Sequence, residues 1–212
     1  MIRAILFDLD DTLFDRAAAH RLYCLDFMSR HPGAFSEERR EADLRILEGD
    51  RLHFARVVSS RFPATGLSLF QAMADQATNF ARFVRPDPLV ALLLATLRGR
   101  YRLAIVSNGS GKTQRAKLAR LGLVDPKLRA FISGELGVAK PMRGLFRKAI
   151  DWVSCEPHEA LFVGDDPVRD IAGAFAAGMA TCWVAAGRSY PEGLPAADLT
   201  INHVGELEEA LA

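Results

Sequence analysis

Short apolar runs and segments with helical spacing follow one another along most of the chain. A first run, Ile2–Phe7, predicts a buried strand. Further apolar runs predict strands at Tyr101–Val106, Ala130–Ser133, Ala160–Val163, Thr181–Val184 and Leu199–Asn202. Helical spacing predicts helices between them at Leu89–Leu97, Lys112–Leu121, Gly144–Val153 and Ile171–Ala177, and a last helix at the C-terminal end. This alternation predicts an α/β fold, a doubly wound parallel sheet with helices on both faces.

The region between the first strand and Pro88 has helical patterns and no convincing strand. Helices are expected at Ala17–Met28, from an N-cap at Ser36 to about Phe62, and at Ser68–Val84. We therefore predict two domains. Residues 1–13 and 87–212 form a Rossmann-like core, and residues 14–86 form a small all-helical cap inserted after the first strand.

The composition argues against a nucleic-acid-binding, secreted or membrane protein. The chain has 212 residues, of which 27 are basic and 26 acidic, so no nucleic-acid partner is expected. Three widely separated cysteines indicate thiols in a reducing compartment. The N-terminal stretch has no signal-peptide pattern, and no apolar run approaches the ~20 residues of a membrane span. We expect a cytoplasmic protein without membrane contact, either a monomer or a homodimer.

The stretch VSNGSGKT, Val106–Thr113, resembles a nucleotide-binding loop. A P-loop needs its first glycine five residues before the second, which here is the position of Val106. Val106 instead closes a predicted strand, so the spacing excludes this interpretation. Lys112 is expected to point elsewhere along its helix, and Ser107 is expected to belong to a different site.

Polar residues follow several predicted strands. Asp8 and Asp10 follow the first strand, Ser107 and Asn108 the second, and a Gly-Asp-Asp stretch begins at Gly164. Ligands bind at the carboxyl ends of the strands in such sheets. Carboxylates gathered there repel one another without a cation, and Mg²⁺ accepts carboxylates, waters and substrate phosphate.

We predict a Mg²⁺ site in which Asp8 and Asp165 are direct ligands, with Asp166 and Asp170 supporting them. Beside Mg²⁺ and phosphate, Asp8 can act as a nucleophile, and Asp10 can serve as general acid and then base. The phosphoryl oxygens need cations and hydrogen-bond donors. Ser107, the backbone around Asn108, and Lys140 are the candidates.

These residues carry a resemblance to the haloacid dehalogenase (HAD) superfamily of hydrolases. The family's motifs occur in order as FDLDDT at Phe7–Thr12, VSNG at Val106–Gly109, KP at Lys140-Pro141 and VGDDPVRD at Val163–Asp170. The helical insert resembles the cap of the subgroup with nucleotidases, phosphosugar phosphatases and haloacid dehalogenases.

The resemblance implies the same roles for Asp8, Asp10, Ser107 and Lys140. It adds the backbone carbonyl of Asp10 to Asp8 and Asp165 as metal ligands. Arg169 departs from the family pattern, which often has asparagine there.

Asp10 favours phosphoryl transfer over dehalogenation, because a halide leaves without a proton and a phosphoester oxygen needs one. The predicted function is a Mg²⁺-dependent phosphatase that hydrolyses a small phosphorylated metabolite, a sugar phosphate or nucleoside monophosphate, through an aspartyl-phosphate. A phosphosugar mutase and a non-catalytic phosphometabolite-binding protein stay open as alternatives.

His20 admits two interpretations. Family members that act on phosphosugars often have a histidine near this position that faces the substrate, so His20 is a candidate substrate-binding residue. The alternative is a histidine that packs within the cap or lies on its surface.

Overall fold

The computed structural model describes residues 1–211, and the chain divides into two compact units. One unit comprises Met1–Phe14 and Pro86–Ala212, and the other comprises Asp15–Arg85. The predicted core and cap ranges differ from these units by one residue at each junction. Ala212, the last residue of the predicted core range, lies outside the described residues.

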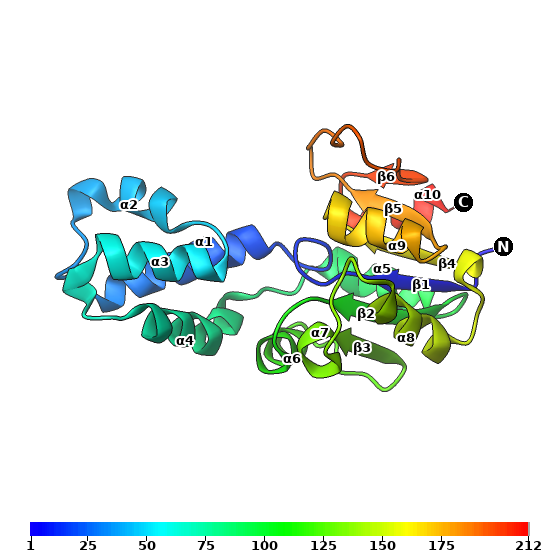
Figure 1. The fold of residues 1–212 in the computed structure, drawn as a ribbon, viewed down its shortest axis with the longest axis horizontal. Helices are drawn as coiled ribbons and strands as arrows, with labels where there is room; N and C mark the ends of the chain where they lie inside the picture. Colours follow the sequence, from blue (N-terminus) through cyan, green and yellow to red (C-terminus); the bar gives the residue numbers. More distant parts are fainter. Residues whose placement is uncertain (212) are drawn as a thin grey trace. The chain divides into compact units, whose positions relative to one another are not determined.

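A six-stranded parallel sheet forms the centre of the first unit (Figure 1). The strands are β1 (Ala4–Phe7), β2 (Arg102–Ser107), β3 (Leu128–Ile132), β4 (Ala160–Gly164), β5 (Ala180–Val184) and β6 (Leu199–Ile201). They lie in the order β3-β2-β1-β4-β5-β6, with every neighbouring pair parallel. The chain therefore starts in the middle of the sheet and winds outward in both directions. The predicted α/β class and doubly wound sheet are confirmed.

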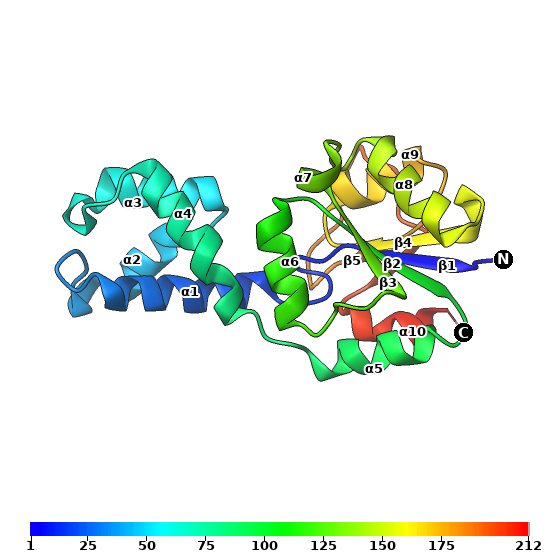
Figure 2. The same ribbon diagram turned by 90° about the horizontal axis from the view of Figure 1, so that it is seen from below.

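Helices cover both faces of this sheet. The helices of the first unit are α5 (Pro88–Leu97), α6 (Gly111–Arg120), α7 (Ser133–Leu136), α8 (Arg143–Val153), α9 (Gly173–Ala176) and α10 (Leu207–Ala210). In Figure 2, α8 and α9 lie on one side of the strands and α5 and α10 on the other. All four residues of β1 are buried, because both of its faces are covered. Leu6 packs with Phe146 of α8 and Phe162 of β4, whose rings meet edge to face at 5.0 Å.

The second unit, which we call the cap, is entirely helical. Its helices are α1 (Arg16–Arg30), α2 (Arg40–Leu47), α3 (Arg51–Arg61) and α4 (Leu69–Asn79), with 3₁₀ turns at Glu37–Arg39, Pro63–Thr65 and Phe80–Phe83. An aromatic cluster fills its centre, where the Phe54 ring lies 5.2 Å from Tyr23 and 5.0 Å from Phe27. Among residues 1–211, no helix in either unit combines the length and apolarity needed to cross a bilayer.

The cap differs from its prediction in one helix. The single helix expected from Ser36 to Phe62 is wrong, because it is broken between Leu47 and Arg51. Gly49 has φ 153° there, and Asp50 starts a new helix by accepting a hydrogen bond from the His53 backbone at 2.8 Å. Ser36 precedes the 3₁₀ turn but makes no side-chain cap.

The segment after β4 also differs from expectation. A π-helix over Pro167–Ala172 includes the first two residues of the helix predicted at Ile171–Ala177, and only Gly173–Ala176 of that range is α-helical. Wider turns of this kind are frequent at functional sites. This π-helix starts directly after Asp165 and Asp166 and contains Asp170.

Candidate active site

The carboxyl ends of three neighbouring strands bring the predicted site residues together. Asp8 follows β1, Ser107 ends β2 and Asp165 follows β4. Phe7 of the central strand pairs with Ile105 on one side and Val163 on the other, so the three strands end at nearly the same level. Asp8 is anchored there because its backbone N–H donates to the Val163 carbonyl at 2.9 Å. Parallel pairing thus gathers residues that are far apart along the chain.

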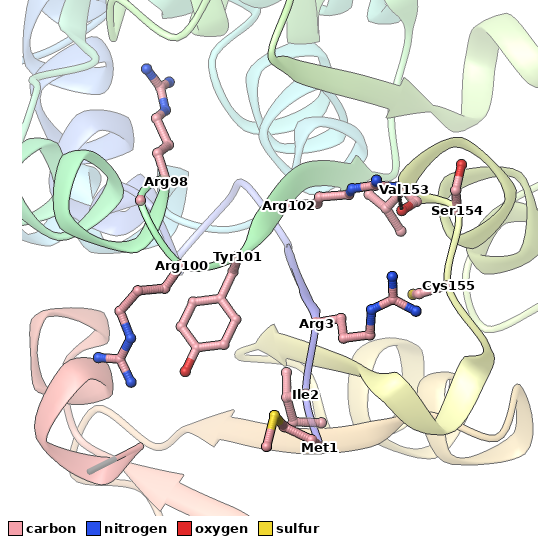
Figure 3. Close-up of a pocket in the computed structure, with 11 residues that line it drawn as sticks. Met1, Ile2, Arg3, Arg98, Arg100, Tyr101, Arg102, Val153, Ser154 and Cys155 are labelled. Carbon is pink, nitrogen blue, oxygen red and sulfur yellow. Dashed lines mark hydrogen bonds between the residues drawn. The ribbon is translucent and has the colours of Figure 1, made fainter.

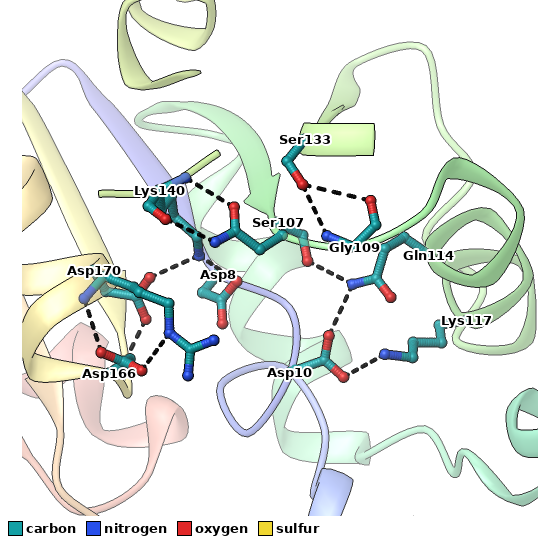
Figure 4. Close-up of polar contacts among 12 residues, drawn as sticks. Asp8, Asp10, Ser107, Gly109, Gln114, Lys117, Ser133, Lys140, Asp166 and Asp170 are labelled. Carbon is teal, nitrogen blue, oxygen red and sulfur yellow. Dashed lines mark hydrogen bonds and ion pairs between the residues drawn. The ribbon is translucent and has the colours of Figure 1, made fainter. Parts of the chain in front are cut away.

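Lys140 lies at the centre of this site (Figure 4). Its Nζ is 2.5 Å from Oδ1 of Asp8 and 2.7 Å from Oδ1 of Asp170, and the lysine is 5 % exposed. Asn108 holds the backbone of Lys140 from both sides, donating to its carbonyl at 2.9 Å and accepting from its N–H at 2.8 Å. The Asn108 side chain therefore positions Lys140.

Three carboxylates gather next to Lys140. One oxygen atom each from Asp8, Asp165 and Asp170 lies within 4.8 Å of the others. Asp170 is therefore a candidate direct metal ligand, whereas the sequence predicted that it would only support the ligands Asp8 and Asp165. Asp166 has a different role: it accepts hydrogen bonds from the backbones of Val168 and Arg169 and so caps the π-helix. Its own backbone N–H donates to Oδ2 of Asp170 at 3.0 Å, which orients that carboxylate.

The electrostatics of the cluster favour an added cation. Burial raises the pKa of Asp8 well above its usual value; Lys140 opposes this rise, and the charges of Asp170 and Asp10 add to it. Burial and the neighbouring charges of Asp170 and Asp11 raise the pKa of Asp165 to about 6. Burial disfavours the charge on Lys140, but Asp170 and Asp8 raise its pKa above the usual value. One ammonium group faces several carboxylates, so the cluster fits a divalent ion with oxygen ligands.

The carboxylate of Asp10 is held apart from this group by α6. Lys117 Nζ lies 2.5 Å from its Oδ1, and Gln114 Nε2 donates to its Oδ2 at 2.8 Å (Figure 4). Sequence reasoning missed Gln114 and Lys117. A signal for them was present in the sequence: they are two long polar residues three positions apart. They lie on the same helix face as Leu118, which is the buried face of α6. Lys112 is exposed, as expected.

Arg188 is a second residue that sequence reasoning missed. Its guanidinium lies 3.3 Å from Oδ2 of Asp165 and donates to the Asp165 carbonyl at 3.1 Å. The indole N–H of Trp183 donates to the same carbonyl at 2.9 Å. Arg188 follows β5 in a loop without a motif, so only the fold associates it with the carboxylates.

His20 lies in the interior of the cap. It is 3 % exposed, Gln76 Nε2 donates to its Nε2 at 2.8 Å, and the Cys24 sulfur is 3.7 Å from its Nδ1. The Phe54 ring meets it edge to face at 6.0 Å. These contacts favour the packing interpretation of His20.

A separate pocket of about 420 Å³ opens at the other end of the strands (Figure 3). Arg3 and Tyr101, which precede β1 and β2, line it together with Cys155, and none of its lining residues is a carboxylate. Three of its arginines are already engaged: Arg3 pairs with Glu159, Arg98 pairs with Asp125, and Arg102 donates to the Val153 carbonyl. The pocket therefore lies at the amino ends of the strands, and the carboxylate cluster lies at their carboxyl ends.

Comparison with known proteins agrees with the geometry. The family model for haloacid dehalogenase-like hydrolases matches residues 2–178. The chain belongs to this family. The HAD-like hydrolase is therefore an enzyme, and the matched range includes the carboxylates, serine and lysine described above.

Individual relatives cover different shares of this HAD-like hydrolase. The pyrimidine 5'-nucleotidase YjjG of Escherichia coli is 38 % identical over 62 % of this chain and 59 % of its own length. A glyceraldehyde 3-phosphate phosphatase of Pyrococcus abyssi is 31 % identical over 89 % of this chain and 83 % of its own. The structure of the HAD hydrolase YfnB of Bacillus subtilis, solved with bound magnesium, has a TM-score of 0.75 and 25 % identity, covering 99 % of this chain and 98 % of that one.

Proposed function

We propose that this HAD-like hydrolase is a Mg²⁺-dependent phosphatase that acts on a small phosphorylated metabolite. The observation that supports the proposal best is the buried Asp8–Lys140 pair beside Asp165 and Asp170, with Asp10 on the same loop. The names of two relatives, a pyrimidine 5'-nucleotidase and a glyceraldehyde 3-phosphate phosphatase, indicate phosphate monoesters as substrates. We therefore propose a sugar phosphate or a nucleoside monophosphate.

In the proposed reaction, a carboxylate oxygen of Asp8 attacks phosphorus and forms an aspartyl-phosphate while the bond to the leaving oxygen breaks. Asp10 gives its proton to that oxygen, and the alcohol departs. Water then attacks the phosphorus and gives a proton to Asp10, and the bond to Asp8 breaks to release inorganic phosphate. Asp8 is regenerated as a carboxylate. A dehalogenase has no need of the proton from Asp10, which is why the presence of Asp10 favours phosphoryl transfer.

The remaining residues bind the transferred group. Ser107 and the backbone near Asn108 donate hydrogen bonds to the phosphoryl oxygens, and Lys140 neutralises their charge. Asp8, Asp165 and the backbone carbonyl of Asp10 would hold Mg²⁺, and we add Asp170 because its carboxylate lies within 4.8 Å of those of Asp8 and Asp165. Mg²⁺ would neutralise charge between the carboxylates and the substrate phosphate.

The test is inorganic phosphate release from para-nitrophenyl phosphate and a panel of sugar phosphates and nucleoside monophosphates. Wild type is compared with Asp8→Asn, each with Mg²⁺ and with EDTA. Asp151→Asn, the same change at an exposed site on α8, is the matched control. We expect Asp8→Asn to lower turnover by at least about 10³-fold and EDTA to abolish it, because the nucleophile and the cation are both needed.

Folded wild type that releases no phosphate from any compound in Mg²⁺ contradicts the phosphatase proposal. Transfer to an intermediate in the presence of a sugar bisphosphate primer then identifies a mutase. Tight binding of a phosphometabolite without transfer identifies a binding protein.

A further inference from the structure

The side chain of Asp10 is held at both of its oxygens by one helix. Lys117 on α6 approaches Oδ1 at 2.5 Å, and Gln114, one turn earlier, donates to Oδ2 at 2.8 Å. Because both oxygens are held, the Asp10 carboxylate is restricted in its position and in its rotation about the Cβ–Cγ bond. A carboxylate on a loop would otherwise sample several rotamers, so α6 supplies the rigidity that the loop lacks.

Both partners are themselves well fixed. Gln114 is 2 % exposed and Lys117 6 % exposed, and they occupy the buried face of α6. The Lys117 Nζ also lies 5.7 Å above the Phe14 ring, and Phe14 pairs with Asp10 across the turn of the loop. Because α6 follows directly from the loop after β2, the helix is anchored to the sheet that carries Asp8.

Gln114 also connects Asp10 with Ser107. The same Nε2 atom donates to Oγ of Ser107 at 2.6 Å (Figure 4). An amide nitrogen has two hydrogens, so one Nε2 can serve both contacts. The Ser107 hydroxyl accepts from Gln114 and keeps its own hydrogen to donate elsewhere, which suits a donor to a phosphoryl oxygen.

We propose that Lys117 and Gln114 are positioning residues that hold Asp10 for proton transfer to the leaving oxygen. This inference rests on the proposed phosphatase function. Gln114 also fixes the position of Asp10 relative to Ser107, the proposed phosphate-binding serine. Lys117 acts through Asp10, and Gln114 acts through Asp10 and Ser107.

The test compares two leaving groups. Para-nitrophenolate leaves as a stable anion, whereas the alkoxide of an alkyl phosphate needs the proton of Asp10. The variants are Lys117→Met, Lys117→Arg and Gln114→Leu, with Arg115→Gln as the control. Arg115 lies on the same helix and also forms an ion pair, with Glu135 at 2.7 Å, but it is solvent-exposed. The measured quantity is kcat/KM, which reports the steps up to departure of the leaving group.

For the best alkyl phosphate of the panel, we expect Lys117→Met to lower kcat/KM by about 10²-fold, within the range of general acid catalysis. The loss for para-nitrophenyl phosphate should be about threefold or less, because its leaving group needs no proton. Lys117→Arg should recover part of the alkyl activity, and Arg115→Gln should behave as wild type. Gln114→Leu should lower kcat/KM for both substrates, because it also removes the hydrogen bond to Ser107, but more for the alkyl phosphate. This unequal loss provides the test if Lys117→Met does not fold, as judged by circular dichroism.

Equal losses on both substrates in folded variants would overturn the positioning role and leave the phosphatase proposal intact. Wild-type activity on the alkyl phosphate in a folded Lys117→Met variant would also overturn it. Absence of wild-type turnover on either substrate contradicts the phosphatase function itself, and this outcome is seen before any variant is compared.

Discussion

Protonation of the buried His20 should destabilise the protein below neutral pH. His20 is 3 % exposed and packs among aromatic rings in the cap. Burial lowers its pKa from 6.5 to about 4; the charges of Arg16 and His53 act in the same direction, and that of Asp50 opposes them. Because the Gln76 amide donates to Nε2, a proton added there would face another donor. The folded state therefore retains the neutral ring.

The pH dependence of the free energy of unfolding follows from the difference between the pKa values of His20 in the folded and unfolded states. The unfolded chain takes up a proton near pH 6.5, and the folded chain only near pH 4, so the free energy of unfolding falls as the pH drops between these values. The contribution of neutral His20 to stability is fully present above the pKa of the unfolded state. It is lost as the pH falls towards the pKa of the folded state. The two pKa values give a loss of about 2 kcal/mol between pH 7 and pH 5.

The assay is urea denaturation followed by circular dichroism at several pH values between these limits. Wild type is compared with His20→Asn, and His158→Gln, which removes an exposed histidine, is the control. Other groups titrate in both proteins, so the difference between wild type and variant isolates His20. We expect His20→Asn to be less stable than wild type at pH 7 and to lose less stability on acidification. KM for the best substrate should stay unchanged.

Two results would contradict a buried, neutral His20 with a packing role. A stability difference between wild type and His20→Asn that is constant from pH 7 to pH 5 means that burial does not keep His20 neutral. A rise in KM with unchanged stability supports the other interpretation of His20, contact with the substrate.

Three further predictions concern the carboxylate cluster. Arg188→Gln should weaken Mg²⁺ binding about tenfold in isothermal titration calorimetry, because Arg188 orients Asp165 and opposes the rise in its pKa; unchanged affinity contradicts this. Gly164→Ala should weaken the same binding by at least about tenfold, since a Cβ there would lie 2.5 Å from the Asp170 carboxylate, whereas Gly33→Ala, with open space around it, should not. Lys140→Met should lower the free energy of unfolding by about 3 kcal/mol or more without Mg²⁺, because two buried carboxylates lose their partner; a Tm equal to that of wild type would argue against the buried pairing.

The sequence was sufficient to predict the fold class and the gathering of the candidate site residues at one end of the strands. Apolar runs that end in Asp8, Ser107 and Gly164-Asp165 are local patterns, and parallel strands place their carboxyl ends at one edge whatever the details of packing. The break at Gly49-Asp50 was missed because the helical spacing continues on both sides of it. Its signal, a glycine followed by a capping aspartate, is weak beside that periodicity.

Which side chains meet depends on the tertiary packing. Lys117 and Asp10 are 107 residues apart, and no local pattern joins them. The same holds for Arg188 beside Asp165, and for Gln76 beside His20, 56 residues away. Asp170 joined the carboxylate group because the π-helix turns it towards Asp8 and Lys140. Such contacts depend on how helices pack on the sheet and within the cap, and side-chain chemistry alone does not specify that packing.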